Sequence, residues 1–225
     1  MDNQETWNRI AKSFDKTRRK AWEECLDFIK KIPKESTVAD IACGNGRHLI
    51  PCAKHCRKVI GLDLSNELLD IINNRLKEEK IKNVTLINSD VVKIPLDDES
   101  VDVSLYIAAL HNIKGRANRI KSLKEVKRIL KKDGAAQISV WSRWQDKYRK
   151  QFFKKWFTQK TDVEFGDIDI YWRQHGLNIP RFYHLYSKKE FQKDLIDAGF
   201  KTIEINNVKM HSKRYPDNYF ALVTK

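Results

Sequence analysis

Apolar residues along the chain follow two alternating spacings. Short runs rich in Val, Ile and Leu predict buried strands at 36–41, 58–63, 84–88, 101–110 and 135–141. Between these runs, apolar residues recur every three or four positions, which predicts helices at about 46–56, 65–79 and 115–131. Strands that alternate with helices favour a parallel sheet with right-handed crossovers.

The spacing of apolar residues changes toward both ends of the sequence. Residues 1–35 have the apolar spacing of an amphipathic helix, which Pro33 closes. After Trp141, residues 143–180 form an insertion rich in basic and aromatic residues, and we expect it to act as a lid over a substrate pocket. Its acid-containing part at 161–170 is the segment expected to move.

Regular spacing returns in the last forty residues or so. Ser187 is predicted to cap a helix that runs to about Ala198, and two closing strands follow at 201–208 and 218–225. We therefore predict one domain over residues 1–225. Its fold class is α/β, a doubly wound and mostly parallel sheet of seven strands whose last two form a hairpin-like addition.

The most informative motif lies where the first strand ends. The strand closes on Asp40, and small residues follow at Ala42, Gly44 and Gly46, while the second strand closes on Asp63. A loop without large side chains lets a ligand approach the backbone closely. A carboxylate that ends the next strand can accept both hydroxyls of a ribose. The pattern predicts half of an adenosine-binding site.

Three adenosine ligands can be compared with this motif. A phosphate-binding loop needs GxxxxGK[ST], but Gly46 is followed by Arg47 and His48. A dinucleotide site needs GxGxxG, whose loop and helix amino end hold a pyrophosphate. Here the pattern is D-x-A-x-G-x-G, and Asp40 would repel a pyrophosphate but suits the amino group of a methionine. S-adenosylmethionine is favoured, with a chance strand turn as the alternative.

The remaining predicted cofactor residues come from the ends of later strands. Asp40 is expected to face the methionine end and Asp63 the ribose, with the small residues shaping the loop. Asp90 follows the third strand and is expected to take the adenine amino group, with the Val91 amide beside it. The predicted cofactor site is completed by Leu64 and Ile107.

The charge balance favours a nucleic-acid partner. The chain carries 44 basic and 30 acidic residues, a net charge of +14, and its pI is about 9.6. One basic stretch is Lys114, Arg116, Arg119, Lys121, Lys124, Lys127, Arg128, Lys131 and Lys132. The other is Arg143, Lys147, Arg149, Lys150, Lys154, Lys155 and Lys160.

Aromatic residues interleave with the second basic stretch. Exposed rings there could stack on the bases of a single-stranded loop. The helical spacing of Trp144, Tyr148, Phe152 and Trp156 instead favours a stripe that faces the core.

Cysteine usage and hydropathy exclude two further classes. The four cysteines are not arranged as the framework of a secreted protein. Cys52, His55 and Cys56 could suggest a metal site, but no second pair completes four ligands, so no metal is predicted. No apolar run reaches the ~18 residues that a membrane span needs. A cytoplasmic protein with free thiols and no membrane partner is expected.

Four segments beyond the cofactor motif resemble one family. They are FDKTRRKAW at 14–22, the segment at 107–134 with its histidine and arginine-rich helix, VWSRWQ at 140–145, and RFYHLYSKKEFQKDLIDAGF at 181–200. These segments resemble the tRNA wobble-uridine carboxymethyl methyltransferases, which convert 5-carboxymethyluridine to its methyl ester. The resemblance covers nearly the whole chain. It implies a tRNA anticodon stem-loop as substrate and a small zinc-containing activator protein as partner.

The resemblance also implies roles for particular residues. Arg18 would reach the carboxylate of the methionine moiety. The implied catalytic residues at the uridine are His111, Asn112, Arg181, Tyr183 and His184. The chain departs from the family pattern at Leu64, where arginine is frequent, at Asn112, which replaces a second histidine, and at Phe182, which replaces a tyrosine.

The chemistry expected from this resemblance needs no strong base. A carboxylate is already ionised at neutral pH, so the enzyme's task is to position and desolvate it. No NPPY or DPPY follows the fourth strand, as methylation of a base amine requires, and no cysteine lies near strands four and five for attack on a pyrimidine carbon. Two alternatives stay open: methylation of a small molecule, and an RNA-binding module that keeps the fold without catalysis.

Overall fold

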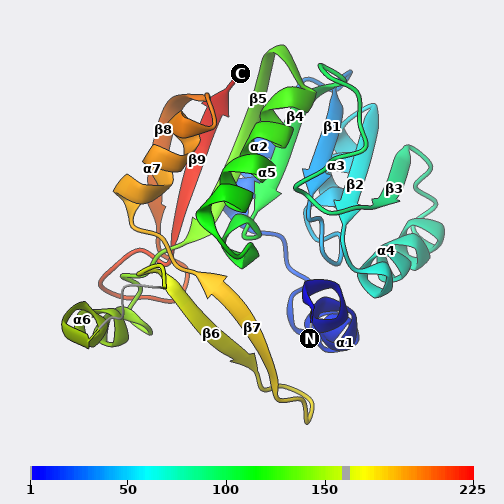
Figure 1. Cartoon of the computed structure of the whole chain (residues 1–225). Helices are drawn as coiled ribbons and strands as arrows, with labels where there is room; N and C mark the ends of the chain where they lie inside the picture. The colour runs from blue at the N-terminus through cyan, green and yellow to red at the C-terminus, as the bar shows by residue number, and fades with distance from the viewer. Residues whose placement is uncertain (1, 159–162) are drawn as a thin grey trace.

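Seven strands pair into one sheet in the order β3-β2-β1-β4-β5-β9-β8 (Figure 1). The computed structural model describes residues 2–158 and 163–225. The strands are β1 (Thr37–Ile41), β2 (Lys58–Asp63), β3 (Val84–Asn88), β4 (Val101–Ile107), β5 (Leu130–Trp141), β8 (Lys201–Val208) and β9 (Asn218–Thr224). The first five are parallel, and β9 runs antiparallel between β5 and β8. The predicted fold class is confirmed.

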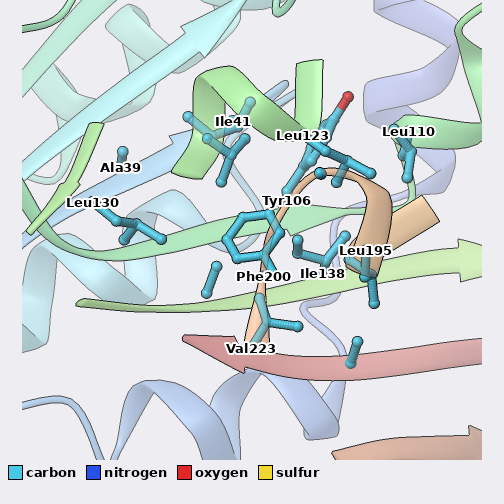
Figure 2. Packing of buried hydrophobic residues seen from close by; sticks show 14 of the residues in the cluster. Ala39, Ile41, Tyr106, Leu110, Leu123, Leu130, Ile138, Leu195, Phe200 and Val223 are labelled. Carbon is cyan, nitrogen blue, oxygen red and sulfur yellow. The ribbon is translucent and has the colours of Figure 1, made fainter. Parts of the chain in front are cut away.

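Helices cover both faces of the sheet. One face packs against α2 (Glu23–Ile29), α3 (Leu49–His55) and α4 (Asn66–Glu78), and the other against α5 (Arg116–Ile129) and α7 (Lys188–Asp197). Figure 2 shows the second face, where Leu123 of α5 and Leu195 of α7 lie over Tyr106 and Ile138. Each such side chain contributes about 1.5–3 kcal/mol by leaving water.

Two helix starts follow the expected capping chemistry. The Ser65 hydroxyl accepts a hydrogen bond from the Leu68 amide at the start of α4. Ser187 and Glu190 form a reciprocal capping box at the start of α7. These caps satisfy amide groups that the helix itself leaves without partners.

The amino-terminal prediction is wrong in one respect. The described residues 2–35 hold two helices rather than one: α1 (Asn3–Thr17) ends before Arg18, and α2 begins after Trp22. Ile10 of α1 is buried against Trp172, whereas α2 packs against the sheet. One straight helix could not reach both places, so tertiary packing overrides a continuous helical pattern.

The insertion contains a helix and a separate hairpin. α6 (Arg149–Thr158) is followed by β6 (Asp167–Trp172) and β7 (Ile179–His184), which pair antiparallel as a two-stranded sheet. Figure 1 shows this hairpin projecting from the carboxyl edge of the main sheet toward α1. Lys160 and the start of the expected mobile segment at 161–170 lie outside the described residues.

The fourth strand is shorter than predicted. It ends at Ile107, because Ala108 adopts a φ of +54° that breaks the extended chain, and a short 3-10 helix follows at Leu110–Asn112. The turn places His111 and Asn112 at the carboxyl end of β4, as the sequence analysis expected.

Candidate active site

A cavity of about 700 Å³ opens at the carboxyl ends of the parallel strands. Its walls come from the ends of β1, β2 and β4, from α1, and from the β6–β7 hairpin. Sequence-predicted residues that line it are Arg18, Asp40, Ala42, Gly44, Asp63, Leu64, Asp90, Val91, Ile107, His111, Asn112, Arg181 and Tyr183. Open α/β sheets bind ligands at this edge.

Asp40 lies at the end of β1 and is 2% exposed. Its Oδ2 atom has no hydrogen-bond partner among the described residues. Its pKa is raised to about 8, because burial and the charge of Asp63 raise it more than the charge of Arg47 lowers it. A buried carboxyl without a partner costs free energy, so a cationic ligand group placed there would be stabilised.

Asp63 at the end of β2 is held by the backbone. Its Oδ2 accepts a hydrogen bond from the Gly44 amide at 2.8 Å, and its Oδ1 accepts one from the Ser65 amide at 2.9 Å. Burial raises its pKa to about 6, against these amide hydrogen bonds. The two bonds fix the carboxylate and leave lone pairs on both oxygens for a ribose diol.

The small residues of the loop have different structural roles. Ala42 and Gly44 line the cavity with φ values of +54° and +59°. Gly46, with a φ of +79°, does not line it. A Cβ on Gly46 would come within 3.0 Å of Ile72 in α4, so this glycine lets the loop pack against that helix. Gly46 therefore shapes the cofactor loop without lining the cavity itself.

A polar network that the sequence analysis missed holds the loop from outside. Asn45 donates to Asp15 of α1 at 2.9 Å and to the Arg18 carbonyl at 3.2 Å. Arg75 of α4 forms an ion pair with Asp15 and donates to the Asn45 carbonyl at 2.9 Å. No sequence spacing relates these residues, because they come from three separate elements.

The adenine side of the predicted site is more open. Asp90 is exposed, and its carboxylate accepts a hydrogen bond from the Val92 amide at 3.1 Å. Val91 and Ile107 provide apolar walls. The Leu64 carbonyl accepts a hydrogen bond from Gln4 of α1, which ties the cavity rim to that helix.

Three rings stack in the opposite wall. His111, Trp141 and Tyr183 lie with ring centroids 5.0–5.3 Å apart. The His111 Nδ1 accepts a hydrogen bond from the Trp141 amide, so its Nε2 carries the proton. Burial and the nearby charge of Arg181 together lower the pKa of His111 to about 3. This imidazole is neutral at pH 7 and can donate a hydrogen bond.

Arg181 places a cation among these rings. Its guanidinium lies 4.9 Å from the Trp172 ring centroid, 5.0 Å from Tyr183 and 5.7 Å from Trp7. Its buried Nε has no partner among the described residues. The Arg18 guanidinium lies 5.5 Å from the centroid of the same Trp172 ring and adds a second cation at the cavity. Together they favour an anionic group in this part of the cavity.

Asn112 has a free acceptor in the same region. Its amide nitrogen contacts the Ala108 carbonyl at 3.4 Å, and its Oδ1 is buried without a partner among the residues described. A ligand donor would satisfy that oxygen.

The assignment of His184 to the uridine pocket is wrong. Its side chain does not line the cavity but lies between Asp167 at 2.7 Å and Glu190 at 2.9 Å. Burial lowers its pKa, but the bonds to both carboxylates outweigh burial and the net shift is upward. Neighbouring strand residues point to opposite faces, so Tyr183 and His184 cannot share the cavity wall.

The ligand atoms of Glu164, His184 and Glu190 lie within 4.8 Å of one another. Both acids are already engaged, Glu164 with Arg119 and Glu190 with Arg143. The group is therefore best described as a buried ion-pair network that joins the hairpin to α5 and α7.

The cysteines considered as metal ligands lie elsewhere. Cys52 and Cys56 are buried free thiols, and His55 contacts the Ile32 carbonyl at 2.8 Å. Burial raises the pKa of both thiols. No helix in the described part of the chain has the length and apolar character to cross a bilayer.

Sequence reasoning also missed Arg47 and Trp172. Arg47 lines the cavity 4.4 Å from the Trp22 ring centroid, and burial lowers its pKa to about 10. Trp172 had a usable signal, because it ends the run DIDIYW at 167–172, whose alternation is typical of a strand with one buried face.

Comparisons with known proteins indicate the class of domain that carries this cavity. A family model described as "Methyltransferase domain" matches residues 39–138, from β1 to β5. A Methanosarcina mazei structure described as a SAM-dependent methyltransferase has a TM-score of 0.74 at 17% identity, over 92% of this chain and 98% of that one. A Haloferax volcanii methyltransferase in complex with the Trm112 methyltransferase activator has a TM-score of 0.68 at 15% identity, over 98% and 94%.

Residues 39–138 thus match a methyltransferase domain, and the fold is that of class I S-adenosylmethionine-dependent methyltransferases. The Asp40 Oδ2 without a partner among the described residues, the Asp63 carboxylate held by two backbone amides and the loop of small residues between them fit that cofactor. The chain's homologues include proteins named tRNA (carboxymethyluridine(34)-5-O)-methyltransferase, which confirms the resemblance found in the sequence.

Two of these homologues differ greatly in length. The Mus musculus protein, ALKBH8, is 32% identical over 165 residues, which are 73% of this chain but 23% of that protein. The chain thus spans about a quarter of that relative. The Schizosaccharomyces pombe protein is 26% identical over 218 residues, which cover 89% of each.

Proposed function

We propose that this enzyme methylates the carboxylate of 5-carboxymethyluridine at the wobble position of a tRNA anticodon. The observation that carries the proposal is Arg181, a buried cation with a free Nε between the aromatic rings of the cavity wall. Such a place suits a flat base that bears an anionic group, because rings stack and a guanidinium pairs with carboxylate. The names of the homologues point to the same substrate.

In this proposal the protein positions the two reactants. Bound S-adenosylmethionine supplies a methyl group on a positively charged sulfur. Asp40 holds the methionine ammonium, Arg18 its carboxylate, and Asp63 the ribose diol. Asp90, Val91, Leu64 and Ile107 surround the adenine. These contacts place the methyl group at the junction of the cofactor and substrate halves of the cavity.

The substrate half then orients the nucleophile. Arg181 holds the uridine carboxylate, while Tyr183 and neutral His111 pack against the base and Asn112 accepts a hydrogen bond from it. A carboxylate oxygen forms the new bond to the methyl carbon as the carbon–sulfur bond breaks, and the sulfur keeps that electron pair. No proton moves, which agrees with a His111 that stays neutral at pH 7.

The segment at 143–180 is part of the same proposal. Its hairpin carries Trp172 against α1 and forms one wall of the cavity. We assign it the role of a cover over the bound uridine. A small zinc-containing activator is the proposed partner, and the Haloferax neighbour that was solved with its activator supports this.

Mass spectrometry of digested tRNA tests the substrate directly. The enzyme is incubated with methyl-labelled cofactor and tRNA that carries 5-carboxymethyluridine, with and without a Trm112-type activator. We expect the label in the methyl ester of that nucleoside. Label in a small molecule of a cell extract, with none in tRNA, would show that the enzyme belongs to the small-molecule class. Cofactor binding without any methyl transfer would favour the other alternative, an RNA-binding module that keeps the fold without catalysis.

A further inference from the structure

The exposed side of α6 carries aromatic residues that the active site does not use. Phe153, Trp156 and Phe157 are 66%, 68% and 75% exposed. The sequence analysis favoured a core-facing stripe at this spacing, and that holds for Tyr148 and Phe152 but is wrong for Trp156. Large exposed rings gathered on one helix indicate a surface that a partner covers.

Positive charge surrounds these rings. Residues 147–158 contain no acidic residue, and Lys150 and Lys154 are exposed on the same helix. Neither lysine has an ion-pair partner in the part of the chain that the structure describes. By contrast Lys155 points inward and donates to the carbonyls of Glu164, Phe165 and Asp167. One cation therefore anchors the helix, and the others face solvent.

Tyr215, from a loop near the carboxyl terminus, adds a fourth ring to the same charged surface. Tyr215 lies 5.0 Å from the Arg149 guanidinium and 5.8 Å from that of Arg214. Asp146 accepts hydrogen bonds from the Lys213 and Arg214 amides, which holds this loop beside the start of α6. Rings between cations, on a fixed platform, are how proteins bind single-stranded nucleic acid.

The other basic stretch of the sequence is less suited to this task. The α5 arginines are engaged internally: Arg119 with Glu164, Arg116 with Asp194 and Asp197, and Arg128 with Glu125 and Asp98. The expectation that this whole stretch faces RNA is corrected for these arginines. Lys121 and Lys124 of α5 are exposed as well, but α5 contains no aromatic residue, whereas α6 carries three exposed rings beside its lysines.

The α6 surface is also joined to the cavity. The inner residues Tyr148 and Phe152 pack with Tyr183, and Trp141 packs against the same cluster. Since Tyr183 and Trp141 line the cavity, α6 packs directly behind that wall of the cavity.

We propose that α6, with Tyr215, is a binding surface for single-stranded RNA whose bases stack on Phe153, Trp156 and Phe157. This surface rests on the proposed function, because it serves to deliver the anticodon loop to the methyl donor. Lys150 and Lys154 contact the phosphates between the stacked bases.

Fluorescence anisotropy tests the surface without requiring methyl transfer. The probes are a labelled uridine-rich RNA strand of roughly 12 nucleotides and a duplex RNA of equal length. The Phe153→Ala, Trp156→Ala, Phe157→Ala triple variant is compared with Ile196→Ala, which removes an exposed apolar side chain of α7. We expect the triple variant to lose about tenfold or more in affinity for the single strand, with little change for the duplex.

A second pair of variants tests the phosphate contacts. Replacement of Lys150 and Lys154 by Gln should reduce the salt dependence of binding by about one unit in the slope of log K against log salt. Replacement by Gln of two exposed lysines, Lys77 of α4 and Lys80 just after that helix, is the matched control. Calorimetry with S-adenosylhomocysteine checks that every variant still binds the cofactor product.

The outcomes separate the two proposals. Wild-type affinity in the triple variant, an equal loss in Ile196→Ala, or binding to phosphatidylserine vesicles in place of RNA would overturn the α6 surface. RNA binding that needs α6, in an enzyme that does not methylate tRNA, would support the surface and overturn the wobble-uridine substrate.

Discussion

At the scale of single residues, the two buried carboxyls of the cofactor site differ in what already satisfies them. Asp63 accepts two backbone amides, whereas an oxygen of Asp40 has no partner among the described residues. Burial raises both pKa values, to about 6 and about 8. The larger pKa shift belongs to Asp40, the carboxyl that a cationic ligand group would satisfy.

The first prediction concerns the pH dependence of cofactor binding. A cation prefers ionised Asp40, so below its pKa of about 8 binding must release a proton. Affinity for S-adenosylmethionine should rise between about pH 6 and 7.5, by up to about tenfold per unit. Calorimetry across this range measures the slope. The Asp40→Asn variant should bind more weakly without the slope, and a flat wild-type profile would contradict the assignment.

The second prediction concerns the ribose contact. Asp63→Ala should weaken cofactor binding by roughly 1–3 kcal/mol, because two hydroxyls and the Gly44 amide lose their acceptor. Calorimetry measures this against Asp70→Ala, an exposed position of α4. An unchanged affinity in Asp63→Ala would refute the ribose role.

The cofactor residues could be found from the sequence because they follow strand ends along a continuous segment. Asp40, Ala42, Gly44 and Asp63 all reach the cavity for that reason. His184 could not be excluded in this way, since its place depends on which face of β7 turns outward. Asn45 and its partners depend on contacts between separate elements, which no local pattern encodes.

At the scale of elements, the buried network around His184 fastens the hairpin to the main sheet. His184 of β7 bonds Asp167 of β6 and Glu190 of α7, and Arg143 pairs with Glu190. Tyr183 and Arg181 lie on the same strand and face the cavity. The network therefore positions the residues proposed to hold the substrate.

The third prediction tests this fastening. The folded pKa of His184 is raised, so its stabilising contribution is complete below the unfolded value of about 6.5 and is lost as pH rises through the folded value. His184→Gln should cost about 3 kcal/mol near pH 6 and less near pH 9. Urea unfolding at both pH values measures the difference. The control variant His211→Gln, at an exposed histidine, should leave the free energy of unfolding unchanged at both pH values. If His184→Gln lost the same free energy at both pH values, the charge assignment would be contradicted.

The sequence predicted the strands of the main sheet well, because buried parallel strands are short apolar runs. It did not predict β6 and β7, whose residues are mixed in polarity and exposed on one face. It also joined α1 and α2, since nothing in the local pattern shows that their apolar faces pack in different places.

At the scale of the whole molecule, α1 bridges the two halves of the cavity. Asp15 holds the cofactor loop through Asn45, and Ser13 accepts a hydrogen bond from Trp172 of the hairpin at 2.8 Å. One helix thus connects the cofactor wall with the substrate wall, so a substitution in α1 should affect both walls of the cavity.

The fourth prediction follows from that bridge. Asp15→Ala should lower the free energy of unfolding by about 2 kcal/mol, because Asn45 and Arg75 both lose a charged acceptor. It should also weaken cofactor binding, since the loop loses its anchor. Urea unfolding and calorimetry measure the two effects. Asp27→Ala, which breaks an exposed ion pair of α2, should do neither. Equal behaviour of the two variants would contradict the bridge.

The strand order has a consequence for synthesis on the ribosome. β9 lies between β5 and β8 although both precede it in the chain. A nascent polypeptide that has emerged only through β8 still exposes the hydrogen-bonding edge of β5, which can template pairing with foreign strands. Translation must therefore proceed past β9 before that edge closes, and chaperones that shield unpaired edges should associate with the nascent chain throughout that interval.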